Sequence, residues 1–186
     1  ATGNLQPTNT VAIGSELSGL VDTVYVEEND RVRRGQVLAQ LDPSKLKDAI
    51  ARSQAGLASA EAKLAQTDAT VQEANAQLAR LEEVSRLSGG KVPSRTEMDS
   101  ARATSSKAAA DRASAQAGVT EARAALSTDQ TNLDKASIRS PVDGVVLSRS
   151  VESGQAVAAQ LQVATLFTIA EDLKAMELKV NVDEAD

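Results

Sequence analysis

The sequence predicts an α+β protein in which a small β-sandwich is split by a long antiparallel α-helical coiled-coil hairpin. Three observations support this prediction: a heptad repeat within residues 43–136, segments rich in Val, Leu, Ile and Gly on either side of it, and short motifs shared by those two segments. The predicted β halves are residues 10–42 and 137–170, and the hairpin spans 43–136 with its tip at 88–94.

Composition excludes several classes of function. The 186 residues carry 20 Lys and Arg against 26 Asp and Glu, a net charge of −6, so we expect no nucleic-acid partner. The sequence contains no cysteine and no histidine, which excludes thiolate and imidazole sites. We therefore expect neither a catalytic site nor a metal site. No apolar run is long enough to span a membrane.

The hairpin prediction rests on residues, most of them apolar, that recur every seven positions. Two series interleave in the first half of 43–136, so the steps alternate between four and three, which is the seam of a coiled coil. One series is Ile50, Leu57, Leu64, Val71 and Leu78, and the other is Leu46, Ser53, Ala60, Thr67, Ala74 and Leu81. The second half of the hairpin is less regular, with Arg112 and Asp129 at two seam positions.

Helix-capping residues stand at the expected boundaries. Asp42-Pro43 offers an N-cap followed by proline at the first helical position, and Ser88-Gly89-Gly90 favours a helix C-terminus. Ser94-Arg-Thr-Glu97 has the spacing of a capping box. We therefore expect helices over about 43–87 and 95–136.

The two β-like segments contain matching motifs. Gly19-Leu-Val21 matches Gly144-Val-Val146, and Val32-Arg-Arg-Gly35-Gln36 matches Val151-Glu-Ser-Gly154-Gln155. Neither half is large enough to bury a sheet face alone, so we expect one β domain built from both. The motifs predict that Gly35-Gln36 and Gly154-Gln155 are related by an approximate two-fold axis. The alternating stretch 176–182 predicts one further strand.

These motifs resemble a known family. The segments around Gly19, Gly35 and Gly144 are similar to the biotinyl/lipoyl half-motifs of bacterial periplasmic adaptors, also called membrane fusion proteins of the HlyD family. The first and last residues, Gly3-Asn-Leu-Gln-Pro7 and 180–186, resemble the MacA-type branch, which works with an ABC transporter. The resemblance implies a lipoyl-like fold for the β domain, with residues 1–9 and 171–186 as edge strands of a β-barrel domain.

The resemblance also implies the partners and the location. An adaptor of this type bridges an inner-membrane ABC transporter (MacB-like) to a TolC-type outer-membrane channel and exports drugs or other small molecules. It works as a homo-hexamer in the periplasm of a Gram-negative bacterium. An anchor outside this sequence attaches it to the inner membrane.

The hairpin tip is the first candidate site. In the family, an Arg, a Leu four residues later and a Ser seven residues after that meet the channel. Leu87 and Ser94 fit this spacing, whereas Glu83 stands at the Arg position and Arg86 is out of register. The candidate docking residues are therefore Glu83, Arg86, Leu87 and Ser94. We also expect Glu82 to pair with Arg86 along the helix.

A loop in the second β half is the second candidate site. In MacA-type adaptors the corresponding loop carries Gln and faces the pore of the hexamer, which implies a pore-lining role for Gln160 or Gln162. Two alternatives to the adaptor remain open, a cofactor-carrying lipoyl or biotinyl domain of a multienzyme complex and a coiled-coil scaffold without a transport role. A cofactor would need a Lys at a β-turn, whereas Lys45 and Lys47 fall in a predicted helix, so we expect no cofactor.

Overall fold

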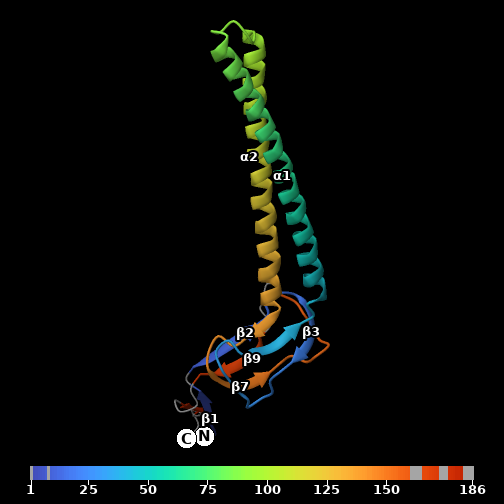
Figure 1. Cartoon of the computed structure of the whole chain (residues 1–186). Helices are drawn as coiled ribbons and strands as arrows, with labels where there is room; N and C mark the ends of the chain where they lie inside the picture. Colours follow the sequence, from blue (N-terminus) through green and yellow to red (C-terminus); the bar gives the residue numbers. More distant parts are fainter. Residues whose placement is uncertain (1, 8, 160–164, 172–175, 182–186) are drawn as a thin grey trace. The chain divides into compact units, whose positions relative to one another are not determined.

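The computed structural model describes residues 2–7, 9–159, 165–171 and 176–181 (Figure 1). In chain order the described elements are β1 (Thr2–Pro7), β2 (Thr10–Gly14), β3 (Gly19–Val24), β4 (Arg31–Val32), β5 (Val37–Leu41), α1 (Ser44–Leu87), α2 (Arg95–Lys135), β6 (Ser137–Arg139), β7 (Gly144–Arg149), β8 (Ala156–Val157), β9 (Thr165–Ala170) and β10 (Met176–Asn181). The chain forms two compact units, one of residues 1–47 with 131–186 and the other of residues 48–130.

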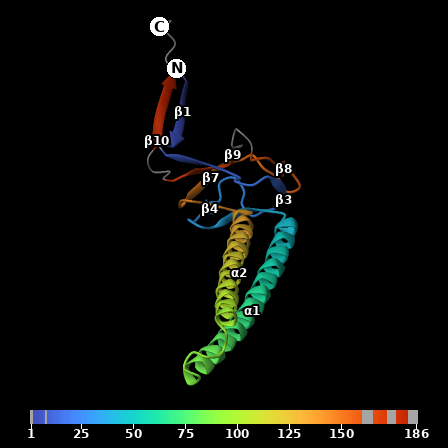
Figure 2. The same ribbon diagram turned by 90° about the horizontal axis from the view of Figure 1, so that it is seen from above.

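The first unit contains two four-stranded sheets of matching organisation. One sheet has the order β2-β9-β7-β4 and the other the order β6-β5-β3-β8. Each sheet combines strands from both β-like segments of the sequence, so the expectation of one β domain built from both segments is confirmed. A separate antiparallel pair, β1 with β10, confirms the strand predicted near the end of the sequence (Figure 2).

The core of this unit consists mainly of aliphatic side chains from both sheets. Phe167 is fully buried and is the sole phenylalanine of the sequence. The other members of the cluster are Ile13, Val21, Val26, Val32, Leu38, Ala39, Leu41, Ala136, Ile138, Val146, Val151, Val157, Leu166 and Ile169. Burial of each larger aliphatic side chain stabilises the fold by roughly 1.5–3 kcal/mol.

The approximate two-fold relation exists, but it pairs different turns from those predicted. Gly19 and Leu20 of β3 pair with Val157 and Ala156 of β8, and reciprocally Gly144 and Val145 of β7 pair with Val32 and Arg31 of β4. This reciprocity confirms the match of Gly19 with Gly144. The approximate two-fold axis therefore relates β3 to β7 and β4 to β8.

The counterpart of Gly154-Gln155 is Asn29-Asp30, and not Gly35-Gln36. The Gly154 N–H donates to the Val21 carbonyl at 2.7 Å, and the Asn29 N–H donates to the Val146 carbonyl at 2.8 Å. In return, the Val21 N–H donates to the Gln155 carbonyl at 2.8 Å and the Val146 N–H donates to the Asp30 carbonyl at 3.0 Å.

The prediction was wrong because three turns share one local geometry. In each turn the fourth side chain accepts a hydrogen bond from the first N–H, and the third residue has a positive φ. The turns begin at Glu27, Arg33 and Glu152, with φ of 71° at Asn29, 83° at Gly35 and 85° at Gly154. Similar turn chemistry therefore does not identify which strands are equivalent.

The second unit is the greater part of the helical hairpin. Helices α1 and α2 run antiparallel and side by side in both views (Figure 1, Figure 2). Each helix is continuous through the regions around Thr67 and Arg112, as the heptad pattern predicts. The fully packed positions of the seam are Thr67 and Ala74 on α1 and Ala108 and Val119 on α2.

Two irregular seam positions on α2 form polar contacts between the helices. Asp129 accepts a hydrogen bond from the Ser53 hydroxyl, and Arg112 forms an ion pair with Asp68. A third contact joins Arg123 to Glu61 at 3.1 Å. Each pair joins one α1 side chain to one α2 side chain, so the set selects a single antiparallel register, although exposed ion pairs contribute little stability.

The N-terminus of α1 is capped as the sequence predicts. The Asp42 carboxylate accepts hydrogen bonds from the Ser44 N–H at 2.9 Å and the Ser44 hydroxyl at 2.6 Å. These bonds lower the pKa of Asp42. The Lys47 N–H donates to the Pro43 carbonyl at 2.9 Å, so Pro43 stands immediately before Ser44, the first residue of α1.

Candidate functional site

The tip begins where two glycines end α1. The Gly90 N–H donates to the Ser85 carbonyl at 2.8 Å, and the Ser88 N–H donates to the Val84 carbonyl at 3.0 Å. Gly89 and Gly90 have φ of 66° and 80°. This region is unfavourable for residues that carry a Cβ atom and is readily adopted by glycine. The bond from Gly90 back to Ser85 has the span expected of a Schellman cap, so the predicted glycine C-cap is confirmed.

Ser94 begins α2 with a complete capping box. Its hydroxyl donates to Glu97 Oε2 at 2.7 Å, and its N–H donates to the same oxygen at 2.9 Å. The Glu97 N–H donates in return to Ser94 Oγ at 3.3 Å. The two hydrogen bonds from Ser94 lower the pKa of Glu97. The predicted cap is confirmed, and the Ser94 hydroxyl proton is already engaged within the chain.

Ser88 is a tip residue whose role the sequence did not reveal. Its hydroxyl donates to the Val92 carbonyl at 2.7 Å and accepts from the Val92 N–H at 3.1 Å. Both backbone polar groups of Val92 are thereby satisfied by one side chain. A serine just before two glycines indicates only a helix end, because the contact between Ser88 and Val92 depends on how the loop folds.

Apolar side chains are exposed at the tip. Leu87 is 71% exposed, Val92 53% and Val84 44%, and Leu87 exceeds every other large apolar side chain in the described part of the chain. Val84 and Leu87 lie three residues apart on the last turns of α1, so they share a face of that helix. Binding of a partner that covers such a side chain is favoured, because apolar surface is removed from water.

Arg86 and Glu83 form an ion pair on α1 beside Leu87. Arg86 Nε donates to Glu83 Oε2 at 2.8 Å and Nη2 donates to Oε1 at 2.5 Å, a two-pronged pair. This pairing lowers the pKa of Glu83 and raises the pKa of Arg86. The predicted partner was Glu82, and that prediction was wrong because Glu83 meets both prongs of the guanidinium from three residues away.

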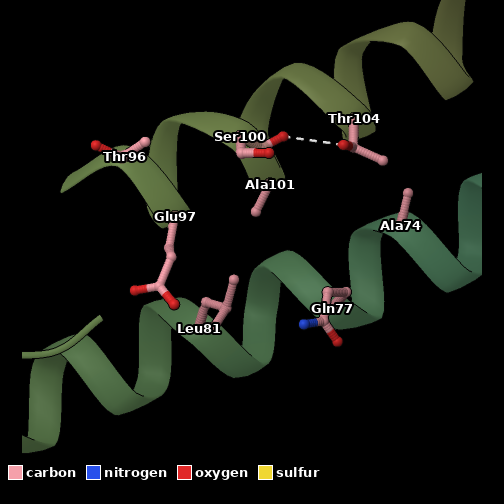
Figure 3. Close-up of a pocket in the computed structure, with 8 residues that line it drawn as sticks. All are labelled: Ala74, Gln77, Leu81, Thr96, Glu97, Ser100, Ala101 and Thr104. Atoms are coloured by element: carbon pink, nitrogen blue, oxygen red, sulfur yellow. Dashed lines mark hydrogen bonds between the residues drawn. The ribbon is translucent and has the colours of Figure 1, made fainter. Parts of the chain in front are cut away.

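A shallow groove of about 490 Å³ lies between α1 and α2 near the tip (Figure 3). It is lined by Ala74, Gln77, Leu81, Thr96, Glu97, Ser100, Ala101 and Thr104. Ala74 and Ala101 point toward the opposite helix, and their small size leaves the groove unfilled (Figure 3). Glu97 is the single titratable residue of the lining, and Ser94 already binds its carboxylate, so the groove offers no acid–base pair.

The remaining candidates from the sequence are two glutamines and two lysines. Gln160 and Gln162 lie outside the described residues. Lys45 and Lys47 are exposed on the first turns of α1, and neither lies at a β-turn. Within the described ranges no three acidic side chains gather in a way that could hold a metal ion. Neither α1 nor α2 is long and apolar enough, over the residues described, to cross a membrane.

Comparison with known proteins identifies relatives over nearly the whole chain. The family model described as "RND MFP, barrel-sandwich hybrid domain" matches residues 9–169. The Macrolide export protein MacA of Yersinia pestis is 33% identical over 186 residues, which are 100% of this chain and 49% of that relative. The Multidrug resistance protein MdtA of Escherichia coli K12 is 30% identical over 155 residues, 83% of this chain and 33% of MdtA.

A solved structure agrees with the sequence relatives. The crystal structure of MacA from Actinobacillus actinomycetemcomitans superposes with a TM-score of 0.85 at 31% identity, covering 99% of this chain and 56% of that one. The chain thus spans about half the length of its MacA relatives. These relatives are adaptors and not enzymes, in agreement with the prediction from composition. The chain belongs to the membrane fusion proteins, the periplasmic adaptor family of efflux pumps that includes MacA and MdtA.

Proposed function

We propose that this chain is part of a periplasmic adaptor that bridges a MacB-like inner-membrane ABC transporter to a TolC-type outer-membrane channel. The resemblance to MacA over the full chain supports the choice of an ABC transporter. In this proposal residues outside the chain anchor the adaptor to the inner membrane, and β1 with β10 begins its β-barrel domain. The exported compounds are drugs or other small molecules, as the name of the macrolide exporter suggests.

In this proposal the length of the hairpin lets the adaptor extend toward the channel. Helix α1 has 44 residues, which at 1.5 Å per residue gives about 65 Å. An isolated two-helix coil with so many small seam residues would be marginally stable, so contacts with neighbouring copies would help to hold it. We propose that six copies pack their hairpins side by side into a tube. In the same assembly, the loop that carries Gln160 and Gln162 lines the pore.

Docking to the channel takes place at the tip, and the exposure of Leu87 is the observation that most strongly supports it. The glycine cap and the Ser94 capping box order the backbone on both sides of the tip, so Leu87 is presented from a defined helix end. An apolar side chain 71% exposed is a favourable contact for the apolar face of another helix. The Glu83–Arg86 pair borders this contact with polar groups.

The test is the export activity of Leu87→Asp in the full-length adaptor. The adaptor, its co-encoded transporter and a TolC-type channel are expressed in a Gram-negative host that lacks its own adaptor, and macrolide resistance is measured. We expect Leu87→Asp to abolish resistance while circular dichroism of the purified chain shows unchanged helix content. Ala79→Asp adds the same carboxylate to an exposed site on α1 and should retain resistance.

Two outcomes would contradict the proposal. Normal resistance in Leu87→Asp would show that the tip is not the docking site. Loss of helix content in that variant would show that Leu87 supports the hairpin itself, which its exposure argues against.

A further inference from the structure

The three exposed apolar residues of the tip come from two different segments. Val84 and Leu87 belong to the last turns of α1, whereas Val92 belongs to the loop between the helices. Helical geometry alone brings Val84 and Leu87 onto one face. The location of Val92 depends on the path of residues 88–92.

Two features hold that path in place, the glycine cap that ends α1 and the side chain of Ser88. A Cβ atom built on Gly89 or Gly90 would meet no other atom within 4 Å, so no group packs against either glycine on that side. Glycines have the widest conformational freedom of all residues. The Ser88 hydroxyl, by contrast, bonds both the N–H and the carbonyl of Val92, at 3.1 Å and 2.7 Å.

Ser88 itself is held by α1. Its N–H donates to the Val84 carbonyl at 3.0 Å, which places it one helical turn after Val84 and next to Leu87. Val92 is therefore tied to the same end of α1 that carries the other two apolar side chains. We name Val84, Leu87 and Val92 the apolar tip surface.

We propose that Ser88 is the positioning residue of the docking contact and that Val92 is its third apolar member. The inference rests on the proposed function, because it concerns the contact with the channel. The Ser88 hydroxyl keeps Val92 beside Leu87, so the partner meets a surface formed before binding, and binding does not have to order the loop.

The same geometry indicates the chemistry of the partner surface. The charges nearest to Leu87 on α1, Glu83 and Arg86, are paired with each other. The tip surface is thus apolar, with a paired polar edge on α1 and the exposed side chain of Lys91 next to Val92 in the loop. It fits an apolar face at the periplasmic end of the channel helices, and a strongly basic face would meet like charge at Lys91.

The test is a double-mutant cycle between Ser88 and Val92, measured as binding of the 186-residue chain to the purified TolC-type channel in nanodiscs. The variants are Ser88→Ala, Val92→Ala, their combination, and Ser88→Thr, which keeps the hydroxyl. We expect Ser88→Ala to weaken binding by about threefold to tenfold, in keeping with the loss of two hydrogen bonds. The combination should bind no more weakly than Val92→Ala alone, and Ser88→Thr should bind like the parent chain.

A second measurement separates positioning from stability. Ser88→Ala should leave the thermal unfolding of the helices unchanged and should accelerate hydrogen exchange of the Val92 amide by about tenfold. Additive losses in the cycle, or unchanged exchange at Val92, would overturn the role of Ser88. Failure of the proposed function would look different, since Leu87→Asp would then bind the channel as well as the parent chain does.

Discussion

Gly144 and Gly19 occupy equivalent positions in the two halves of the β unit, yet they should respond very differently to a methyl group. A Cβ atom on Gly144 would lie 2.2 Å from the Ala170 carbonyl oxygen and 2.7 Å from Ile169 Cγ2. A Cβ atom on Gly19 would lie 3.6 Å from Leu41 Cδ1, which is an ordinary contact. The difference arises because Ile169 and Ala170, at the end of the neighbouring strand β9, lie against Gly144, whereas the atoms near Gly19 belong to the Leu41 side chain.

The magnitude follows from how far the neighbouring atoms can move. The obstacle at Gly144 is the backbone of β9, which is paired with β2 and β7 and cannot shift without breaking ladder bonds. We therefore expect Gly144→Ala to cost about 3 kcal/mol, the upper end of the range for overpacking. Gly19→Ala should change the free energy of unfolding by less than about 0.5 kcal/mol, like most substitutions without a clash.

Urea unfolding of the 186-residue chain measures both variants. Tyr25 is the single tyrosine of the sequence, which has no tryptophan. Because Tyr25 lies in the β unit, tyrosine fluorescence reports on that unit alone. Circular dichroism follows the helices in the same samples. Equal midpoints for Gly144→Ala and Gly19→Ala would refute the reasoning, as would a loss in Gly144→Ala that appears only in the helix signal.

Two further predictions concern the hairpin. Val119 is 1% exposed, so Val119→Ala should lower the free energy of unfolding by about 2 kcal/mol. Val84→Ala, at the exposed tip, should change the free energy of unfolding little. Thermal melts in which Val84→Ala is the less stable of the two variants would contradict the packing. Ser94→Ala should cost about 1 kcal/mol as a lost N-cap. Hydrogen bonds lower the pKa of Glu97, so the stability that they confer is present above the unfolded value near 4.5 and is lost as the pH falls through the folded pKa. The difference between the melting temperatures at pH 7 and pH 3 should therefore be smaller in Ser94→Ala than in the parent chain. An equal difference would show that the capping box is not responsible for this pH dependence.

The hairpin could be predicted from sequence because its signals are local. The heptad steps, the Asp42-Pro43 start and the Ser94–Glu97 box each act within a few residues, and the helices begin and end within one residue of the expected bounds. Capping residues work through their own backbone neighbours, so their identity is sufficient to place them.

The equivalence of the β halves could not be predicted from turn motifs because it depends on long-range pairing. Three turns share the same hydrogen bonds, and the sequence match of Arg33–Gln36 with Glu152–Gln155 is the most obvious one. A better signal was the spacing of buried valines. Val26 follows Gly19 by the same seven positions as Val151 follows Gly144, and both valines are in the core.

The tip was predicted in part. The choice of Leu87 as a docking candidate followed from the family spacing, and the Ser94 cap followed from the capping box. The Ser88–Val92 contact and the choice of Glu83 over Glu82 as the partner of Arg86 depend on side-chain directions in a folded loop and helix end, which sequence spacing does not determine.

Cross-linking from single cysteines tests the central claim, that the tip contacts the channel, most directly. The 186 residues contain no cysteine, so one introduced thiol carries one photoactivatable cross-linker. Lys91→Cys places it in the exposed tip loop without altering the apolar tip surface, and Lys63→Cys places it on an exposed turn of α1 far along the sequence from the tip. In cells that express the transporter and the TolC-type channel, illumination should join the adaptor to the channel through Lys91→Cys and not through Lys63→Cys. Equal cross-linking from both positions, or cross-linking to the channel from Lys63→Cys alone, would contradict docking through the tip.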